Sequence, residues 1–325
     1  MSSKITIFWL SIFFLATAYS SDAQQVTKVH RIGLLCQEAC NNSLYNTLRQ
    51  RLVELGYIGQ NILIEDRAVE NRYEKLPDLV AGLLRLKLDV ILTGGSTELP
   101  RAVNNATKTV PIVFVTAEDP VSAGLVTSFA RPGNNLTGFT SLNAELDGKR
   151  LALLREVVPR IKRVAVLSNP ADPATAAMWR VTEPTARSLN IQLQRLEIRG
   201  PGDLDSAIGT ATNRGAEALA ALTSPIFFPY LQRIADLAAK KRLPTVSAWR
   251  QLTEVGGIMS YGVDISELFR RAAIYVDKIL KGARPADMPV ERPVKVQLII
   301  NLKAAKEIGL TIPPEVLQRA DKVIR

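Results

Sequence analysis

The sequence predicts an α/β protein built from two successive open parallel sheets. Short aliphatic and β-branched runs alternate with stretches whose apolar residues recur at helical spacing, which is the pattern of βαβ units. The alternation breaks once, at the turn-rich segment 131–135, and then resumes as a second series. The chain has 325 residues, of which 47% are hydrophobic and 22% charged, a composition typical of a globular protein large enough for two domains.

The first series begins with a buried strand at 31–36. A helix over 44–55 follows, because Leu44, Leu48, Leu52 and Leu55 share one helical face, and Gly56 ends it. The remaining elements of this series are expected as a strand at 61–65, a helix at 73–86, a strand at 89–93, a helix at 97–106 and a strand at 111–115.

The second series starts after a helix at 146–158 with the strand 163–167. Its further elements are expected as a helix at 174–189, a strand at 191–196, a helix at 204–214, a strand at 218–222, a helix at 229–241, and strands at 244–247 and 257–261. A long amphipathic helix at 265–280 and a strand at 294–300 come after this sheet is complete. We therefore expect the chain to cross between the sheets more than once, with the Pro/Gly-rich piece 282–293 as one crossing.

The first residues have the order of a secretory signal. Lys4 gives a positive start, 5–18 is an uncharged apolar run, and Ser21-Asp22-Ala23 offers small residues at a cleavage site. The alternative is an uncleaved anchor, but the run is shorter than the roughly 20 residues that span a membrane, and a polar stretch follows at once. We expect residues 1–23 to be a signal peptide cleaved near Ala23, and the mature protein to be periplasmic.

The net charge of +10 does not by itself indicate a nucleic-acid partner. The basic residues are spread along helices in mixed pairs, and no block of five like charges occurs. We interpret the excess as a solvated basic surface and expect no nucleic-acid partner.

The two cysteines, Cys36 and Cys40, lie in one local stretch. In an extended segment their Cα atoms would be about 13 Å apart, beyond the ~7 Å limit for a disulfide. A disulfide therefore requires the chain to turn there, and both free and bridged thiols stay open. His30 is the one histidine, so the sequence indicates neither a metal nor an organic cofactor.

Several catalytic and nucleotide-binding motifs are missing from the sequence. No G-x-G-x-x-G follows the first strand, and neither a P-loop nor a G-x-S-x-G elbow occurs. With one histidine at the start of a strand, a Ser-His-Asp or Cys-His arrangement is disfavoured. We expect no enzyme; the alternative is an exported α/β enzyme that uses Asp119 or Glu38 as acid or base.

Polar and aromatic residues gather where the predicted strands end, which is where open α/β sheets bind ligands. Hydroxyls, amides, a carboxylate and aromatic faces suit a small polar ligand. The candidate ligand-binding residues are Gln37, Asn41, Gly95, Ser96, Thr116, Asp119, Asn169, Ser224, Trp249 and Tyr261.

Each of these candidates also has a purely structural interpretation. The segment 94–96 can be a tight turn with a helix cap, or its N–H groups can hold a ligand carboxylate. Asp119, before Pro120, can be a cap or can pair with a ligand amine. Asn169 can be a turn residue, and Trp249 and Tyr261 can be partial core.

Motifs along most of the predicted mature chain resemble the ABC-transporter substrate-binding family that includes tryptophan- and tyrosine-type binding proteins. They are Gly56-Tyr57 with Gly59-Gln60-Asn61-Ile62, Asp119-Pro120-Val121 with Gly124-Leu125-Val126, Arg131-Pro132-Gly133-Asn134-Asn135-Leu136-Thr137-Gly138, Glu145-Leu146-Asp147-Gly148-Lys149-Arg150, the run 270–282, and Ile300-Asn301-Leu302 with Gly309-Leu310-Thr311-Ile312-Pro313-Pro314.

The resemblance implies a type I periplasmic binding protein with two Rossmann-like lobes and three interlobe crossings. The lobes would comprise 24–143 with 262–288, and 144–261 with 289–325. A monomer would capture an amino acid or related ligand by hinge closure and dock on a permease and ATPase in the inner membrane. A sensory module for a membrane receptor would use the same cleft. The Cys36–Cys40 loop replaces a Ser/Pro/Gly-rich loop of the family, which leaves the ligand open.

Overall fold

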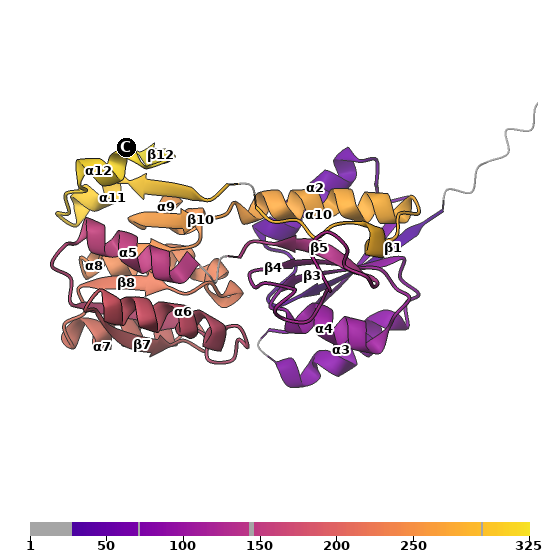
Figure 1. The fold of residues 1–325 in the computed structure, drawn as a ribbon, viewed down its shortest axis with the longest axis horizontal. Coiled ribbons are helices and arrows are strands. Elements are labelled where there is room, and N and C mark those ends of the chain that lie inside the picture. The colour runs from indigo at the N-terminus through magenta and orange to yellow at the C-terminus, as the bar shows by residue number, and fades with distance from the viewer. Residues whose placement is uncertain (1–27, 71, 143–145, 294) are drawn as a thin grey trace, which may run out of the picture.

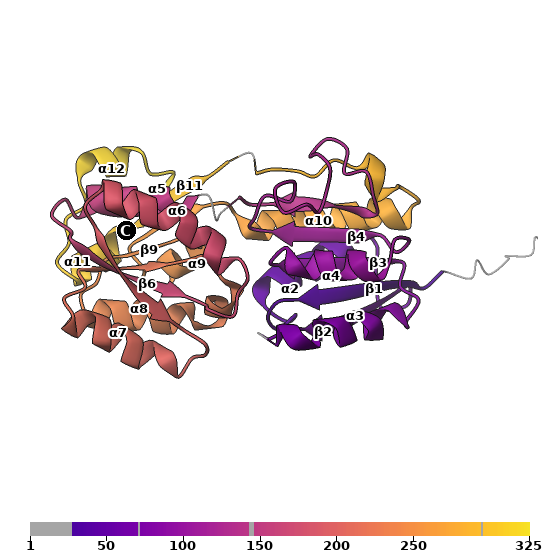
Figure 2. The ribbon, with the colours of Figure 1, turned by 60° about the horizontal axis from the view of Figure 1, so that its bottom comes forward.

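The computed structural model describes residues 28–70, 72–142, 146–293 and 295–325. Two sheets, each with helices on both faces, form two lobes that lie side by side (Figure 1, Figure 2). This confirms the predicted α/β architecture. The signal peptide expected at 1–23 lies outside the described residues. Within those residues, none of the helices combines the length and the apolar character that a membrane span requires.

The first sheet has the strand order β2-β1-β3-β4-β5, and every neighbouring pair is parallel. Its strands are β1 His30–Cys36, β2 Ile62–Ala68, β3 Val90–Gly95, β4 Ile112–Thr116 and β5 Leu136–Thr140. The central strands are continuous apolar runs because both of their faces are covered. Their carboxyl ends consequently share one edge, which faces the second lobe (Figure 1).

Strand β5 was not expected: the segment 131–135 was interpreted as a turn-rich break, and no strand was predicted after it. The turn ends at Asn135, and β5 pairs with β4. Gly138 lies opposite Phe114 with φ of 153°, and a Cβ there would come within 2.1 Å of the Phe114 carbonyl oxygen. A glycine is therefore required inside this strand, and it weakened the strand signal in the sequence.

Helices cover both faces of the first sheet. On one face lie α2 Ser43–Glu54 and α10 Ile265–Leu280, which pack against each other (Figure 1). On the other face lie the 3₁₀ turn η1 Tyr73–Lys75, α3 Leu76–Leu84 and α4 Glu98–Ala106. Helix α10 comes late in the sequence and still belongs to the first lobe, so the chain returns to that lobe after building most of the second.

The second sheet has the order β12-β11-β10-β9-β8-β6-β7. Its strands are β6 Arg163–Ser168, β7 Gln192–Glu197, β8 Ala218–Ala221, β9 Thr245–Ser247, β10 Met259–Gly262, β11 Gln297–Asn301 and β12 Lys322–Ile324. The expectation of a purely parallel sheet is wrong at one pair, because β11 runs antiparallel to β10. Gln297, the first residue of β11, lies opposite Gly262, the last residue of β10. The chain re-enters this lobe at the edge that faces the first lobe, so β11 runs against β10.

Two helical layers also cover the second sheet. The first contains α5 Asp147–Val157, α6 Thr175–Ser188, α11 Leu302–Glu307 and α12 Pro314–Gln318. The second contains α7 Asp203–Asn213, η3 Pro225–Tyr230, α8 Leu231–Lys240 and α9 Arg250–Glu254. The short elements α9, α11, α12 and β12 were not expected, because each is too short to show a periodic pattern.

In the described parts of the chain, three passages lead from one sheet to the other. They follow β5, β10 and the 3₁₀ turn η4 Pro285–Asp287. Glu291 still bridges to Phe139 of β5, so the last passage lies beyond the boundary expected at 288. We assign 28–142 with 263–293 to the first lobe and 146–262 with 295–325 to the second.

A buried ion pair lies beside two of these passages. Arg150 of α5 contacts Asp147 at 2.5 Å, and each side chain is only 3% exposed. Arg150 Nε also donates to the carbonyl of Tyr261 at 2.7 Å, next to the end of β10. Burial raises the pKa of Asp147 to about 6, although the arginine opposes this. The pair thus joins the start of α5 to the strand from which the chain crosses back.

Candidate functional site

A cleft that opens to the solvent lies between the lobes. The strand ends and helix starts of both lobes form it. From the first lobe it is lined by Gln37, Glu38, Asn42, Leu44, Tyr45, Gly94, Gly95, Ser96, Val115, Thr116, Ala117, Glu118, Ser141, Ile265 and Phe269. From the second lobe it is lined by Asp172, Ala174, Met178, Thr223, Pro225, Phe228, Trp249 and Gln251.

Gln37 is buried on the floor of the cleft at the end of β1. Its backbone N–H donates to the Gly94 carbonyl at 3.1 Å, and its side-chain Oε1 accepts from the Ser96 N–H at 2.7 Å. Gly95 has φ of 134°, and a Cβ there would lie 2.4 Å from Gln37 Oε1. The glycine is therefore required for the glutamine to lie across the β3 end.

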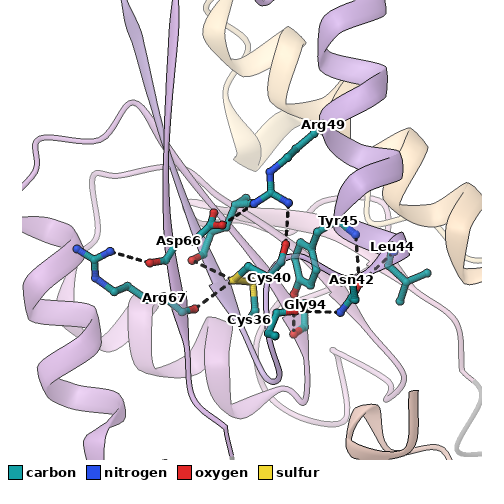
Figure 3. The surroundings of a disulfide bond; sticks show 11 residues. Cys36, Cys40, Asn42, Leu44, Tyr45, Arg49, Asp66, Arg67 and Gly94 are labelled. Carbon is teal, nitrogen blue, oxygen red and sulfur yellow. Dashed lines mark hydrogen bonds and ion pairs between the residues drawn. A yellow bond between two sulfur atoms is a disulfide. The ribbon is translucent and has the colours of Figure 1, made fainter. Parts of the chain in front are cut away.

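The loop that carries Gln37 and Glu38 is closed by a disulfide between Cys36 and Cys40, whose Cα atoms are 5.6 Å apart (Figure 3). The chain does turn here, as a disulfide requires. Arg49 of α2 donates to the Cys40 carbonyl at 2.6 Å, and Asn42 caps α2 by accepting from the Leu44 N–H at 3.0 Å. The loop is thus fixed at both ends beside the cleft.

A direct hydrogen bond joins the two lobes across the cleft. Gln37 Nε2 donates to Asp172 Oδ2 at 2.9 Å, and the Ser224 hydroxyl donates to the same oxygen at 2.8 Å. The other oxygen, Oδ1, accepts from the Ala174 N–H at 3.0 Å, at the start of α6. Burial raises the pKa of Asp172, and these hydrogen bonds oppose the shift.

Two further carboxylates line the first-lobe side. Glu118 accepts from the Thr97 N–H at 3.1 Å and from the Thr97 hydroxyl at 3.0 Å; burial raises its pKa against these bonds. Burial raises the pKa of Glu38 to about 7, and the charges of Glu70 and Asp172 add to that effect. The cleft therefore gathers acidic groups, in contrast to the basic protein as a whole.

Aromatic side chains form two walls of the cleft. Tyr45 of α2 and Phe269 of α10 meet edge to face, with ring centroids 4.9 Å apart, in the first lobe. Phe228 and Trp249 meet in the same way at 5.2 Å in the second lobe. Such pairs are rigid apolar surfaces, so the cleft suits a ligand with an apolar or aromatic body and few polar groups.

Half of the predicted ligand-binding residues line this cleft, and their role in binding stays a prediction. Those that line it are Gln37, Gly95, Ser96, Thr116 and Trp249. Ser224 stands behind the lining and positions Asp172.

The other four predicted residues are not among the lining residues. Asn41 is exposed, and its carbonyl accepts from Asn46. Asp119 accepts from the Val121 N–H at 2.8 Å and so caps a turn. Asn169 is fully buried and accepts from the Ala171 N–H, and Tyr261 packs against the core of its own lobe. For Asp119, Asn169 and Tyr261 the structural interpretation describes the observed contacts.

The candidate list omitted several lining side chains, among them Glu38, Glu118 and Asp172. Glu38 and Glu118 lie next to the candidates Gln37 and Asp119 near strand ends, so their charge was the available signal. Asp172 and the aromatic residues Tyr45, Phe228 and Phe269 lie on helices or loops beyond the strand ends, where the sequence does not show which face meets the cleft. Within the described residues, no group of three His, Cys, Asp or Glu side chains is arranged to hold a metal ion.

Comparison with known proteins agrees with this arrangement. A profile of the family described as ABC transporter substrate binding protein matches residues 32–324. A tyrosine-binding protein of Clostridioides difficile is 25% identical over 252 residues, which is 78% of this chain and 72% of that protein.

Two solved structures show the same fold. A conserved domain protein from Vibrio cholerae superposes with a TM-score of 0.79 and 25% identity, over 91% of this chain and 100% of the other. An ABC domain in complex with L-Trp from Streptococcus pneumoniae gives 0.77 and 23%, over 91% and 100%. The type I periplasmic binding fold is thereby confirmed, and because the family match covers almost all of the described chain, the protein belongs to the ABC transporter substrate binding protein family.

Proposed function

We propose that the protein is the periplasmic solute-binding subunit of an ABC uptake transporter and captures a small ligand, an amino acid or a related compound, in the interlobe cleft. The family consists of substrate-binding proteins that act outside the cytoplasm, and not of enzymes. The observation that carries the proposal is the cleft itself, which strand ends of both lobes line and which the Gln37–Asp172 bond spans.

The ligand is proposed to have an aromatic body. One relative is a tyrosine-binding protein, and one structural neighbour holds L-Trp. In this chain the Tyr45–Phe269 and Phe228–Trp249 pairs offer aromatic faces from both lobes. A ring held between the lobes would contact both walls only when they approach, so it would stabilise the closed arrangement more than the open one. That difference in affinity is what allows binding to drive closure.

The proposed partners are a permease and its ATPase in the inner membrane, which would recognise the closed surface of a monomer. The family membership supports a transporter partner. The N-terminal pattern of Lys4, an apolar run and small residues before Ala23 supports export with cleavage near that alanine.

Thermal unfolding in the presence of amino acids, amines, short peptides and sugars tests this function. A ligand at 100 times its Kd adds about 2.7 kcal/mol to the free energy of unfolding, because it binds the folded state alone. Trp249→Ala should weaken the shift, since it removes one wall, and Tyr261→Phe, which alters a residue outside the lining, should keep it. If no small solute in this panel raises the melting temperature, the proposal is wrong, and a positive hydrolase or transferase assay would then favour the enzyme.

A further inference from the structure

The lining of the cleft is acidic in a basic protein. The chain has 41 Lys and Arg against 31 Asp and Glu, yet the lining includes Glu38, Glu118 and Asp172. Among the described residues that line it there is no lysine, arginine or histidine. A ligand carboxylate placed here would have no cationic side chain to pair with and would lie among three acidic groups.

At two of the helices that begin at the cleft, α4 and α6, the protein itself uses N–H groups of the positive end. At the start of α4, the Ser96 N–H donates to Gln37 and the Thr97 N–H donates to Glu118. At the start of α6, the Ala174 N–H donates to Asp172. Helix N-termini are the usual site for a ligand anion, and at α4 and α6 side chains of the protein already accept from these N–H groups.

The three acidic groups differ in whether their carboxylate oxygens accept hydrogen bonds from the protein. Asp172 and Glu118 accept from neighbouring side chains and backbone N–H groups. Glu38 Oε1, in contrast, is buried and accepts no hydrogen bond from any residue that the structure describes. A buried carboxylate oxygen without a donor is costly, and a ligand ammonium would supply the missing donor and the opposite charge.

A second polar group on the opposite lobe is also without a partner. Thr223 lines the cleft, is 7% exposed, and its hydroxyl makes no hydrogen bond within the described residues. The aromatic pairs of both lobes line the same cleft, and aromatic faces attract cations. These unpaired polar groups and the aromatic walls favour a small organic molecule over water as the occupant of the cleft.

We infer that the cleft selects an aromatic amine that carries a cationic nitrogen and no carboxylate, in preference to a zwitterionic aromatic amino acid. This rests on the proposed function, in which the cleft is the ligand site. Glu38 receives the ammonium group, the Tyr45–Phe269 and Phe228–Trp249 walls hold the ring, and Thr223 hydrogen-bonds from the second lobe. The acidic lining then disfavours the amino acid, because its carboxylate would meet acidic groups and no cationic side chain.

Matched probes separate the contribution of the ligand's ammonium group from that of its carboxylate. Calorimetric titration would compare tryptamine, L-tryptophan and indole-3-propionate, and then tyramine, L-tyrosine and 3-(4-hydroxyphenyl)propionate. We expect one amine to bind at least about tenfold more tightly than its amino acid, and the acids to bind least. If in neither pair the amine binds more tightly than its amino acid, although some of these probes bind, the inference is overturned and the proposed function stands.

If none of the six probes binds, the inference is judged on the ligand identified in the thermal-unfolding panel. An amine without a carboxylate supports the inference, and a neutral, zwitterionic or anionic ligand overturns it. If no solute in that panel binds at all, the proposed function fails and the inference fails with it.

The Glu38→Gln variant tests the assigned role of this carboxylate. It should reduce the preference for amine over amino acid about tenfold or more, whereas Glu74→Gln, the same change at an exposed position of the same lobe, should leave the preference unchanged. The ratio of the two affinities is the readout, because a general loss of folding would lower both together. An unaltered ratio in Glu38→Gln would overturn the assignment.

Discussion

Glu38 is the ionisable side chain whose environment most affects the behaviour of the cleft. Burial raises its pKa to about 7, and Glu70 and Asp172 oppose its ionisation further. Near neutral pH the group is therefore partly protonated, and a bound cation would favour its charged form. The affinity for a cationic ligand should rise with pH through this range, because the carboxylate gains charge.

The same group makes stability depend on pH in the absence of ligand. The folded-state pKa lies above the ordinary value of 4.5, so the folded state holds the proton more strongly than the unfolded chain. Its favourable contribution is full below pH 4.5 and is lost as pH rises through about 7. Chemical denaturation at pH 4.5 and 7.5 should show a smaller pH-dependent loss in Glu38→Gln than in the unaltered protein, and an equal loss would contradict this.

At the level of single residues, the sequence identified the edge of the sheet more reliably than the side chains on it. Trp249 and Gln37 were found because they directly follow strands, and strand ends meet at one edge. Asp172 was missed because it lies three residues beyond Asn169, in a loop whose direction depends on tertiary packing. Asp119 was included for its charge, but that charge serves the turn that follows it.

Among the elements, α5 depends on a polar interaction that burial makes unusually sensitive. Arg150 contacts Asp147 on its own helix and the Tyr261 carbonyl on β10, with both charged side chains buried. A buried pair of this kind adds little over an apolar replacement, but the loss of one partner leaves an uncompensated charge.

Arg150→Ala should therefore lower the free energy of unfolding by about 3–5 kcal/mol, measured by urea denaturation. Glu156, also on α5, forms an exposed ion pair with Arg319. The control Arg319→Ala should therefore lower the free energy of unfolding by at most about 1 kcal/mol. An apolar double replacement, Asp147→Leu with Arg150→Met, should recover much of the loss. A single variant as stable as the control would show that the pair is not needed.

Helices and strands were predictable where the segment was long enough to show a regular pattern of apolar residues. The long helices α6 and α10 and the buried strands of both sheets illustrate this. Strand β5 escaped because Gly138 and two threonines replaced its apolar signal. The direction of β11 could not be predicted, because it depends on the lobe from which the chain arrives and not on local sequence.

For the whole molecule, the Gln37–Asp172 bond is a direct link between the two lobes at the cleft. Arg250 of the second lobe also pairs with Asp264 of the first at 3.0 Å. Because the acceptor of the Gln37 bond is a carboxylate, such a bond contributes about 1.5–3 kcal/mol. It therefore favours the closed arrangement of the lobes and cooperates with any ligand that touches both.

Gln37→Ala should consequently shift the lobes apart, which small-angle scattering would detect as a larger radius of gyration in the absence of ligand. Ligand affinity should fall by roughly tenfold, since about 1.4 kcal/mol corresponds to that factor. Asn42→Ala is the control, because Asn42 also lines the cleft but bonds within its own lobe. An unchanged radius in Gln37→Ala would show that closure does not depend on this bond.

The closeness of the two cysteines has a consequence for how the protein matures. The chain contains two cysteines, four positions apart, and they pair with each other. Within one chain no incorrect pairing is available, so a newly exported molecule needs an oxidant but no disulfide isomerase. Closing so short a loop contributes only about 2 kcal/mol by restricting the unfolded chain. Oxidation should thus be a single step that shapes the floor of the cleft without being needed for the rest of the fold to form.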